Sequence, residues 1–212
     1  MKAIIHQLAL GKMANFVYII EDCATQYCAI VDPAWDVPAI LDCIKTKALT
    51  LQFILLTHGH FDHTDGIAEC LAYKDVPVYL SNQELSSLTP NNDALKKTYD
   101  ADQLKLGETI ITIFHTPGHS PGGQCFYLKP HLITGDTLFI NGCGRCDLGG
   151  SSLNQMYNSL EKIKSFPSDT IIYPGHQYDD KITDTLKNQK QTNRFLTCSS
   201  LKEFTRKRGG NP

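Results

Sequence analysis

The sequence predicts a mixed α/β fold in which helices lie outside a pair of sheets. Short runs rich in β-branched and aromatic residues fill the first third of the chain and resume at Ile110, as is typical of strands. Amphipathic segments with helical spacing separate these runs. A cluster of histidines directly follows one apolar run. The length of 212 residues fits a single domain over 1–212 that buries a full core.

The first half of the chain is expected to alternate strands with helices. Asp36 is placed to cap a helix that runs to about Lys45. A second helix is expected over Asp62–Tyr73, whereas residues 81–108 are polar and irregular, so we predict no regular structure there. The strands expected in this half are Ala3–Leu8, Phe16–Ile20, Tyr27–Val31, Phe53–Leu56 and Val76–Leu80.

The second half repeats the pattern of strands followed by a helix and a strand. A helix is expected over Leu153–Ser165, with its apolar residues at helical spacing. The tail from Thr183 is weakly helical and ends in basic residues, which predicts a solvated end. The strands expected here are Ile110–Phe114, Gln124–Leu128, His131–Thr134 and Thr170–Tyr173.

Composition and charge narrow the class of protein. The formal net charge is −2, so no strong field indicates nucleic acid or an anionic membrane as a partner. The N-terminal apolar stretch is too short for a secretory signal, and no apolar run approaches the roughly 20 residues of a membrane span. The eight cysteines have no regular spacing and are expected to stay reduced. We therefore predict a cytoplasmic protein.

The segment Thr57–His63 concentrates four metal-ligand side chains in six residues. His58 and His60 are two residues apart, and Gly59 leaves the backbone between them free to turn. Asp62 and His63 follow where a helix should start. Imidazole and carboxylate ligands suit zinc and other divalent ions. This spacing predicts a metal site and is compatible with one ion or with two.

Three more candidate ligands follow strand-like runs later in the chain. His119, Asp136 and His176 each come directly after a glycine, at the end of an apolar segment. Taken alone, each of these residues would as readily be an ordinary structural residue. Only the presence of the Thr57–His63 motif favours a role as metal ligand for them. Together the five histidines and two aspartates predict a two-ion site at one rim of the sheets. The histidines at positions 6, 115 and 131 are interpreted as ordinary structural residues.

These motifs resemble the metallo-β-lactamase superfamily over nearly the whole chain. The matching positions are Asp32-Pro33, the His58–His63 motif, His119, Asp136 and His176, in that order. The resemblance implies a four-layer αβ/βα sandwich with two mixed sheets and helices on the outer faces. It also implies that His58, His60 and His119 hold one ion, that Asp62, His63 and His176 hold the second, and that Asp136 bridges. Asp32 would orient a ligand imidazole.

Within the superfamily the chain is most similar to the glyoxalase II (hydroxyacylglutathione hydrolase) branch. The phrases that carry this likeness are Thr116–Gly122, Gly135–Phe139, Gly142–Arg145 and Tyr173–Tyr178. The resemblance implies that Arg145 and Tyr178 contact the substrate. It implies two divalent ions, zinc with iron or manganese as alternatives, and hydrolysis of a small-molecule thioester, linked to glutathione or to a carrier, by a metal-bridging hydroxide. Asp62 would assist that hydroxide in a secondary role.

The sequence is also compatible with other functions. The loop Cys143–Asp147 is similar to the corresponding loop of persulfide dioxygenases, which bind one iron through the positions of His58, His119 and Asp136 and usually carry alanine where Gly175 stands. A thioesterase that edits acyl carriers, or a non-catalytic relative that binds one, also fits. Cys143 and Cys146 are read as loop structure, with redox chemistry or zinc as alternatives. The oligomeric state is not predicted.

Overall fold

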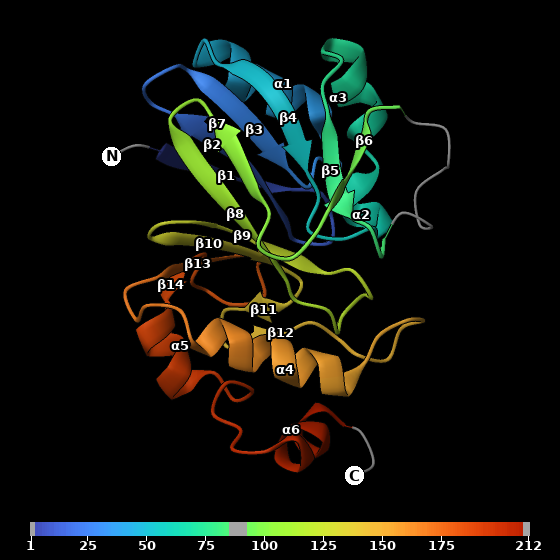
Figure 1. Ribbon diagram of the computed structural model, residues 1–212, viewed down its shortest axis with the longest axis vertical. Helices are drawn as coiled ribbons and strands as arrows, with labels where there is room; N and C mark the ends of the chain where they lie inside the picture. The colour runs from blue at the N-terminus through green and yellow to red at the C-terminus, as the bar shows by residue number, and fades with distance from the viewer. Residues whose placement is uncertain (1–2, 85–92, 210–212) are drawn as a thin grey trace.

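Two sheets of six strands face each other, and helices cover the outer face of each (Figure 1). The computed structural model describes residues 3–84 and 93–209. The strand order is β1-β2-β3-β4-β5-β6 in one sheet and β14-β13-β10-β9-β8-β7 in the other. Both sheets mix parallel and antiparallel pairs. The predicted fold class is therefore confirmed.

The first sheet begins with an antiparallel meander and continues with parallel strands. Its strands are β1 (Ala3–Leu10), β2 (Asn15–Asp22), β3 (Tyr27–Val31), β4 (Thr50–Leu55), β5 (Val78–Ser81) and β6 (Leu95–Thr98). The helices of this half are α1 (Val37–Thr46), α2 (Phe61–Thr64) and α3 (Ile67–Tyr73). The Asp36 side chain caps α1 by accepting a hydrogen bond from the Ala39 amide, as the sequence predicts.

The second sheet is antiparallel except where β10 pairs with β13. Its strands are β7 (Gln103–Leu106), β8 (Thr109–His115), β9 (Gln124–Leu128), β10 (His131–Gly135), β13 (Ile171–Pro174) and β14 (Asp184–Thr185). A short hairpin joins β11 (Leu138–Phe139) to β12 (Gly142–Cys143). The helices of this half are α4 (Leu153–Lys164), α5 (Leu186–Thr192) and α6 (Leu201–Arg208).

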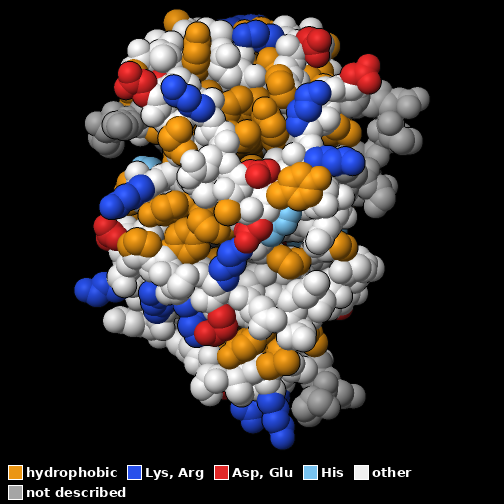
Figure 2. Space-filling model, viewed as in Figure 1, with side chains coloured by type: hydrophobic (Ala, Val, Ile, Leu, Met, Phe, Trp, Pro, Cys, Tyr) orange, Lys and Arg blue, Asp and Glu red, His pale blue; other side chains and the backbone are white. Residues whose placement is uncertain are grey.

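Three apolar clusters hold these layers together. One lies between the first sheet and the helices α1 and α3, and includes Ile30, Ile40 and Ile54. A second fills the space between the sheets, where Phe126 is fully buried. The third packs α4, α5 and α6 against the second sheet around Met156. On the face seen in Figure 2, acidic and basic side chains are interspersed, in line with the small net charge.

Two expectations from the sequence are wrong. The helix expected over Asp62–Tyr73 is broken into α2 and α3 at Gly66, whose amide donates to the Pro33 carbonyl. The region 81–108 was expected to be irregular, but it contains β6 and β7, while residues 85–92 lie outside the described residues. Both strands are short and lie at sheet edges, so their outward side chains are polar and conceal the strand pattern.

Within the described ranges, no helix combines the length and the apolar composition that crossing a bilayer requires.

Candidate metal centre

All seven predicted ligand residues lie at one edge of the two sheets, in segments that follow strands. His58 and His60 follow β4, and Asp62 and His63 lie on the short helix α2. The remaining three come from the second sheet, where His119 follows β8, Asp136 follows β10 and His176 follows β13. Because both sheets end here, residues up to 118 positions apart in the sequence meet in one place.

The candidate ligand atoms form three overlapping groups, and one of them, His58, His63 and Asp136, connects the other two. His58, His60 and His119, called here the first-ion group, offer ring nitrogens that lie within 4.8 Å of one another. The same holds for the ligand atoms of the second-ion group, which consists of Asp62, His63 and His176. These are the two sets that the family resemblance implies.

Asp136 lies between the two groups. One carboxylate oxygen is 3.4 Å from His119 Nε2 and 3.3 Å from His176 Nε2, and the other is 3.5 Å from His63 Nε2. A Cβ atom on Gly175 would lie 2.3 Å from Asp136 Oδ1, so only glycine leaves room for this carboxylate orientation. The position fits the bridging role that the family resemblance implies.

Hydrogen bonds on the outer side of the second-ion group fix which ring nitrogens face inward. His63 Nδ1 lies 3.0 Å from Asp32 Oδ2, and His176 Nδ1 lies 2.9 Å from the Met13 carbonyl oxygen. Both partners are acceptors, so each Nδ1 carries the proton and donates it. The two Nε2 atoms, 3.3 Å apart, are therefore left to bind either a shared proton or a cation.

The first-ion group has a similar but sparser set of outer contacts. The Thr57 hydroxyl donates to Asp32 Oδ2 at 2.6 Å and therefore accepts from His58 Nδ1 at 3.0 Å. His119 Nδ1 donates to the Arg145 carbonyl oxygen at 2.9 Å. His60 instead turns its own Nδ1 inward, to within 2.9 Å of His119 Nε2. Three imidazole nitrogens thus face one point.

The charge environment of the two groups differs. Burial, followed by the neighbouring imidazoles, holds the pKa of His58 well below its usual value and also lowers the pKa of His60. Burial also opposes protonation of His63, but Asp136 and then Asp32 outweigh it and raise the pKa to about 9. The pKa of His176 is raised in the same way: burial opposes protonation, and the bond to Asp136 outweighs it. The carboxylates that attract these protons would attract a cation for the same reason.

Buried polar atoms without partners support a metal at this place. His58 Nε2 and Asp136 Oδ1 are both buried and, among the described residues, have no hydrogen-bond partner. Leaving a buried polar atom unpaired is costly, and a coordinated ion would satisfy both atoms. The donor set of imidazole nitrogens and carboxylate oxygens suits zinc and other first-row divalent ions. The residues present therefore fit two ions.

The remaining predicted residues surround the site. Asp32 is buried and accepts hydrogen bonds from the Thr57 amide and hydroxyl as well as from His63. Tyr178 is 61% exposed, and its ring stacks on His176 at a centroid distance of 4.9 Å. Arg145 is exposed and forms two hydrogen bonds with the Asp147 carboxylate, of 2.7 and 2.8 Å.

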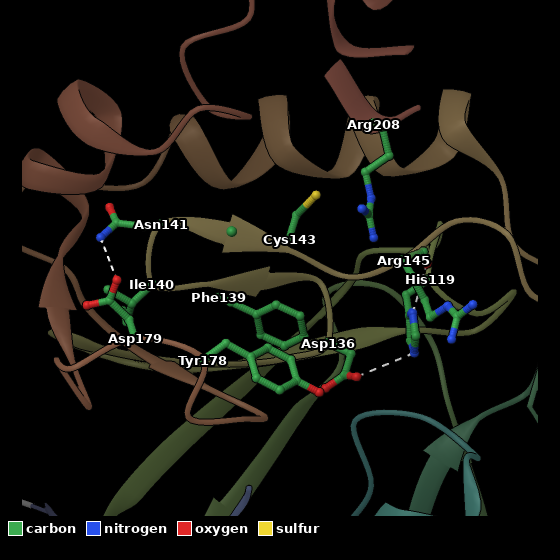
Figure 3. Close-up of a pocket in the computed structure, with 11 residues that line it drawn as sticks. His119, Asp136, Phe139, Ile140, Asn141, Cys143, Arg145, Tyr178, Asp179 and Arg208 are labelled. Carbon is green, nitrogen blue, oxygen red and sulfur yellow. Dashed lines mark hydrogen bonds and ion pairs between the residues drawn. The ribbon is translucent and has the colours of Figure 1, made fainter. Parts of the chain in front are cut away.

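A cavity of about 400 Å³ adjoins the metal centre. His119 and Asp136 form part of its wall, and Arg145 and Tyr178 lie at its rim (Figure 3). The Tyr178 hydroxyl points toward the Asp136 carboxylate (Figure 3). Arg208, at the end of α6, also lines the cavity, so the basic tail is not the purely solvated end that the sequence predicts.

The structure favours a structural role for the cysteine pair in this loop. Burial raises the pKa of the Cys143 thiol to about 12 and also raises the pKa of Cys146. All eight cysteines are free, and the metal-binding groups found among the described residues include none of them. Both thiols therefore stay protonated at neutral pH, which favours the structural reading of this loop.

Sequence reasoning missed three contributors to the site. Asn15 is buried at the start of β2 and donates hydrogen bonds to Asp62. Thr57 connects His58 to Asp32, and the Met13 carbonyl holds His176. A backbone carbonyl leaves no mark on the sequence, and a lone asparagine far from the motif carries no signal of its partner.

Comparison with known proteins agrees with this geometry. A probable polyketide biosynthesis zinc-dependent hydrolase of Bacillus velezensis is 33% identical over 192 residues, which cover 90% of this chain and 85% of that protein. A hydroxyacylglutathione hydrolase of Citrobacter koseri is 37% identical over 91% of this chain and 72% of its own length. The crystal structure of ETHE1 from Myxococcus xanthus matches with a TM-score of 0.88 and 26% identity, covering 97% of this chain and 89% of that one.

The family model described as "Metallo-beta-lactamase superfamily" matches residues 10–176, which contain every candidate ligand. With glyoxalase II proteins among its relatives, the chain belongs to the metallo-β-lactamase superfamily and is a metal-dependent hydrolase of that family.

Proposed function

We propose that this protein is a thioesterase that uses two divalent ions, zinc in the first instance, to hydrolyse a small-molecule acyl thioester. The observation that carries the proposal is the position of Asp136, whose carboxylate lies within 3.5 Å of imidazole nitrogens from both ligand groups. Two-ion sites of hydrolases need such a shared ligand. When bound, the ions would lower the pKa of water toward neutrality and polarise the thioester carbonyl.

The chain's own residues would position the substrate and hold the ligands. Tyr178 lies over the site, and burial followed by Asp136 and Asp62 raises the pKa of its hydroxyl, which therefore stays protonated and can donate to the substrate. Asp62 can accept a proton after the attack, in addition to its role as a ligand. The leaving thiolate is stable at neutral pH, so no strong general acid is required.

The thiol part of the substrate would lie in the cavity beside the ions. Arg145 and Arg208 both line this cavity, and a guanidinium is suited to carboxylates and phosphates. A relative is named for hydroxyacylglutathione and another for polyketide biosynthesis, so both glutathione-linked and carrier-linked thioesters are candidates.

The test combines metal analysis with a substrate panel. We expect two zinc ions per chain and turnover of acylglutathione or acyl-carrier thioesters. The variant His60→Ala should lose an ion of the first group together with activity, whereas His115→Ala, which alters a half-buried histidine on β8 outside the site, should keep both. Thioester hydrolysis by metal-free protein would contradict the proposal. One iron per chain with oxygen uptake on glutathione persulfide would replace it with a persulfide dioxygenase.

A further inference from the structure

The loop between β3 and α1 holds two non-glycine residues at positive φ. Asp32 has a φ of 54° and Trp35 a φ of 69°. Such values are strained for a bulky side chain and persist only where the surroundings impose them. Asp32 delivers its carboxylate to Thr57 and His63. The positive φ of Trp35 likewise places its side chain for a specific contact.

The Trp35 indole donates a hydrogen bond to Asn15, and Asn15 donates to Asp62 of the second-ion group. The indole Nε1 donates to Asn15 Oδ1 at 2.8 Å. The Asn15 Nδ2 donates in turn to the Asp62 carbonyl at 2.9 Å and to Asp62 Oδ2 at 3.1 Å. Because an indole can only donate, it fixes the amide with its oxygen toward Trp35 and its NH₂ group toward Asp62. The reverse orientation would place a carbonyl oxygen against two acceptors.

Asn15 is enclosed at the point where the two halves of the fold meet. Its exposed fraction is 1%, and its backbone forms an isolated bridge with His176. One residue thus contacts two members of the second-ion group. A buried amide that loses its partners carries a penalty, so its donors are committed to Asp62.

Trp35 is itself held from three sides. Its backbone amide donates to Asp65 Oδ1 at 3.0 Å, and the edge of its ring meets Phe61 at a centroid distance of 6.2 Å. A Cβ atom on Gly11 would lie 2.3 Å from the indole ring, so the ring lies directly against that glycine. The indole is a fixed donor rather than a mobile surface group.

We propose that Asn15 and Trp35 are positioning residues that hold Asp62 as a ligand of the second ion, and that they thereby set the affinity of the second-ion group. The inference rests on the proposed two-ion function. Outer partners of metal ligands commonly change metal affinity by about 10–100-fold. This chain of hydrogen bonds from Trp35 through Asn15, called here the relay, reaches Asp62 alone among the candidate ligand side chains. The affinity of the first-ion group should therefore not depend on the relay.

The experiment measures zinc affinity by competition with a chromophoric chelator, without reference to activity. Asn15→Ala should weaken binding of the second ion by about 10–100-fold. Trp35→Phe keeps one aromatic ring and removes the indole N–H together with the second ring, so at least the loss of one hydrogen bond, about three- to tenfold, is expected. Repeating both changes in a His60→Ala background, which weakens the first-ion group, isolates the second ion.

Asn158→Ala is the matched control, because it removes an exposed asparagine amide on α4 that donates to Asn154 and to no candidate ligand. It should bind both ions like the unchanged protein. Unchanged affinity for the second ion in both Asn15→Ala and Trp35→Phe would overturn the relay and leave the two-ion proposal standing. Equal weakening of both ions, with a lower Tm of the metal-free protein, would show a merely structural role and also overturn the relay. A single ion in the unchanged protein would overturn both proposals.

Discussion

The two halves of the metal centre differ in how their ligands are held. Every member of the second-ion group is buried and has an outer partner: Asn15 for Asp62, Asp32 for His63 and the Met13 carbonyl for His176. In the first-ion group, His60 is half-buried and, within the described part of the chain, has no hydrogen bond from its side chain except to His119. The second-ion group is therefore fully enclosed by the fold, whereas the first-ion group is open to solvent at His60.

The two groups have similar ligands, but different segments of the fold hold those ligands in place. The second-ion group depends on the β1–β2 turn and on the strained loop after β3, both from the first sheet. The first-ion group depends on Thr57, which adjoins its own ligand, and on one carbonyl of the β12–α4 loop. We expect the second ion to be retained longer and to be more sensitive to changes far from the site.

Removal of the ions should have the largest effect on the whole centre. A chelator is expected to abolish hydrolysis and to lower the free energy of unfolding by about 8 kcal/mol, about 4 kcal/mol for each ion, if both ions are present at roughly a thousand times their Kd. For a chain of this size that corresponds to a fall in Tm of about 16–32 °C. Differential scanning calorimetry during stepwise chelation would check this. Simultaneous loss of both ions would contradict the difference between the halves, because the ion of the open first group should leave first.

Asp136→Asn should affect both halves at once. The amide keeps the shape of the carboxylate but removes the charge that faces imidazoles of both groups. We expect weaker binding of both ions and a fall in kcat/KM of about 10³-fold. Asp100→Asn changes an exposed carboxylate paired with Lys162 and serves as the control. Full retention of two ions by Asp136→Asn after dialysis would show that the carboxylate does not bridge.

Asp32→Asn should affect the second half more than the first. Asparagine tolerates the positive φ of this position, so the backbone can stay in place. The loss of charge weakens the acceptor for His63, and the expected loss of affinity for the second ion is about 10–100-fold. Zinc competition in the His60→Ala background measures it. If the first ion were lost preferentially, the contact through Thr57 would be the dominant role of Asp32.

The pH dependence of metal binding should also separate the halves. The pKa of His63 is raised to about 9, so at pH 7 the metal-free site holds a proton that the second ion must displace. The affinity for the second ion should therefore fall by about tenfold for each pH unit between pH 9 and pH 7 if one proton is released. The pKa values of His58 and His60 are lowered, so the first ion displaces no proton from either of them at pH 7. Calorimetry in two buffers would measure the number of protons released as each ion binds. Equal proton release at both steps would contradict the expected difference between the two groups.

The sequence predicted the candidate ligands and the arrangement of helices outside a pair of sheets, because both depend on local patterns. The motif His58–His63 is compact, and the later ligands directly follow apolar strands. The outer contacts were not predictable, since Asn15 and Asp62 are 47 residues apart and Met13 and His176 are 163 apart. The edge strands β6 and β7 were missed because one face of each is polar. The break at Gly66 depends on a carbonyl from another loop, which helical spacing does not reveal.

The Asp136 carboxylate limits which side chains position 175 can hold. A methyl group there would lie where Asp136 Oδ1 now lies, at 2.3 Å, and within 2.9 Å of the Gly135 backbone carbon. A substitution at 175 therefore acts on a residue 39 positions earlier in the sequence before it acts on anything else. An alanine at 175 therefore requires the Asp136 carboxylate to turn away from its present orientation.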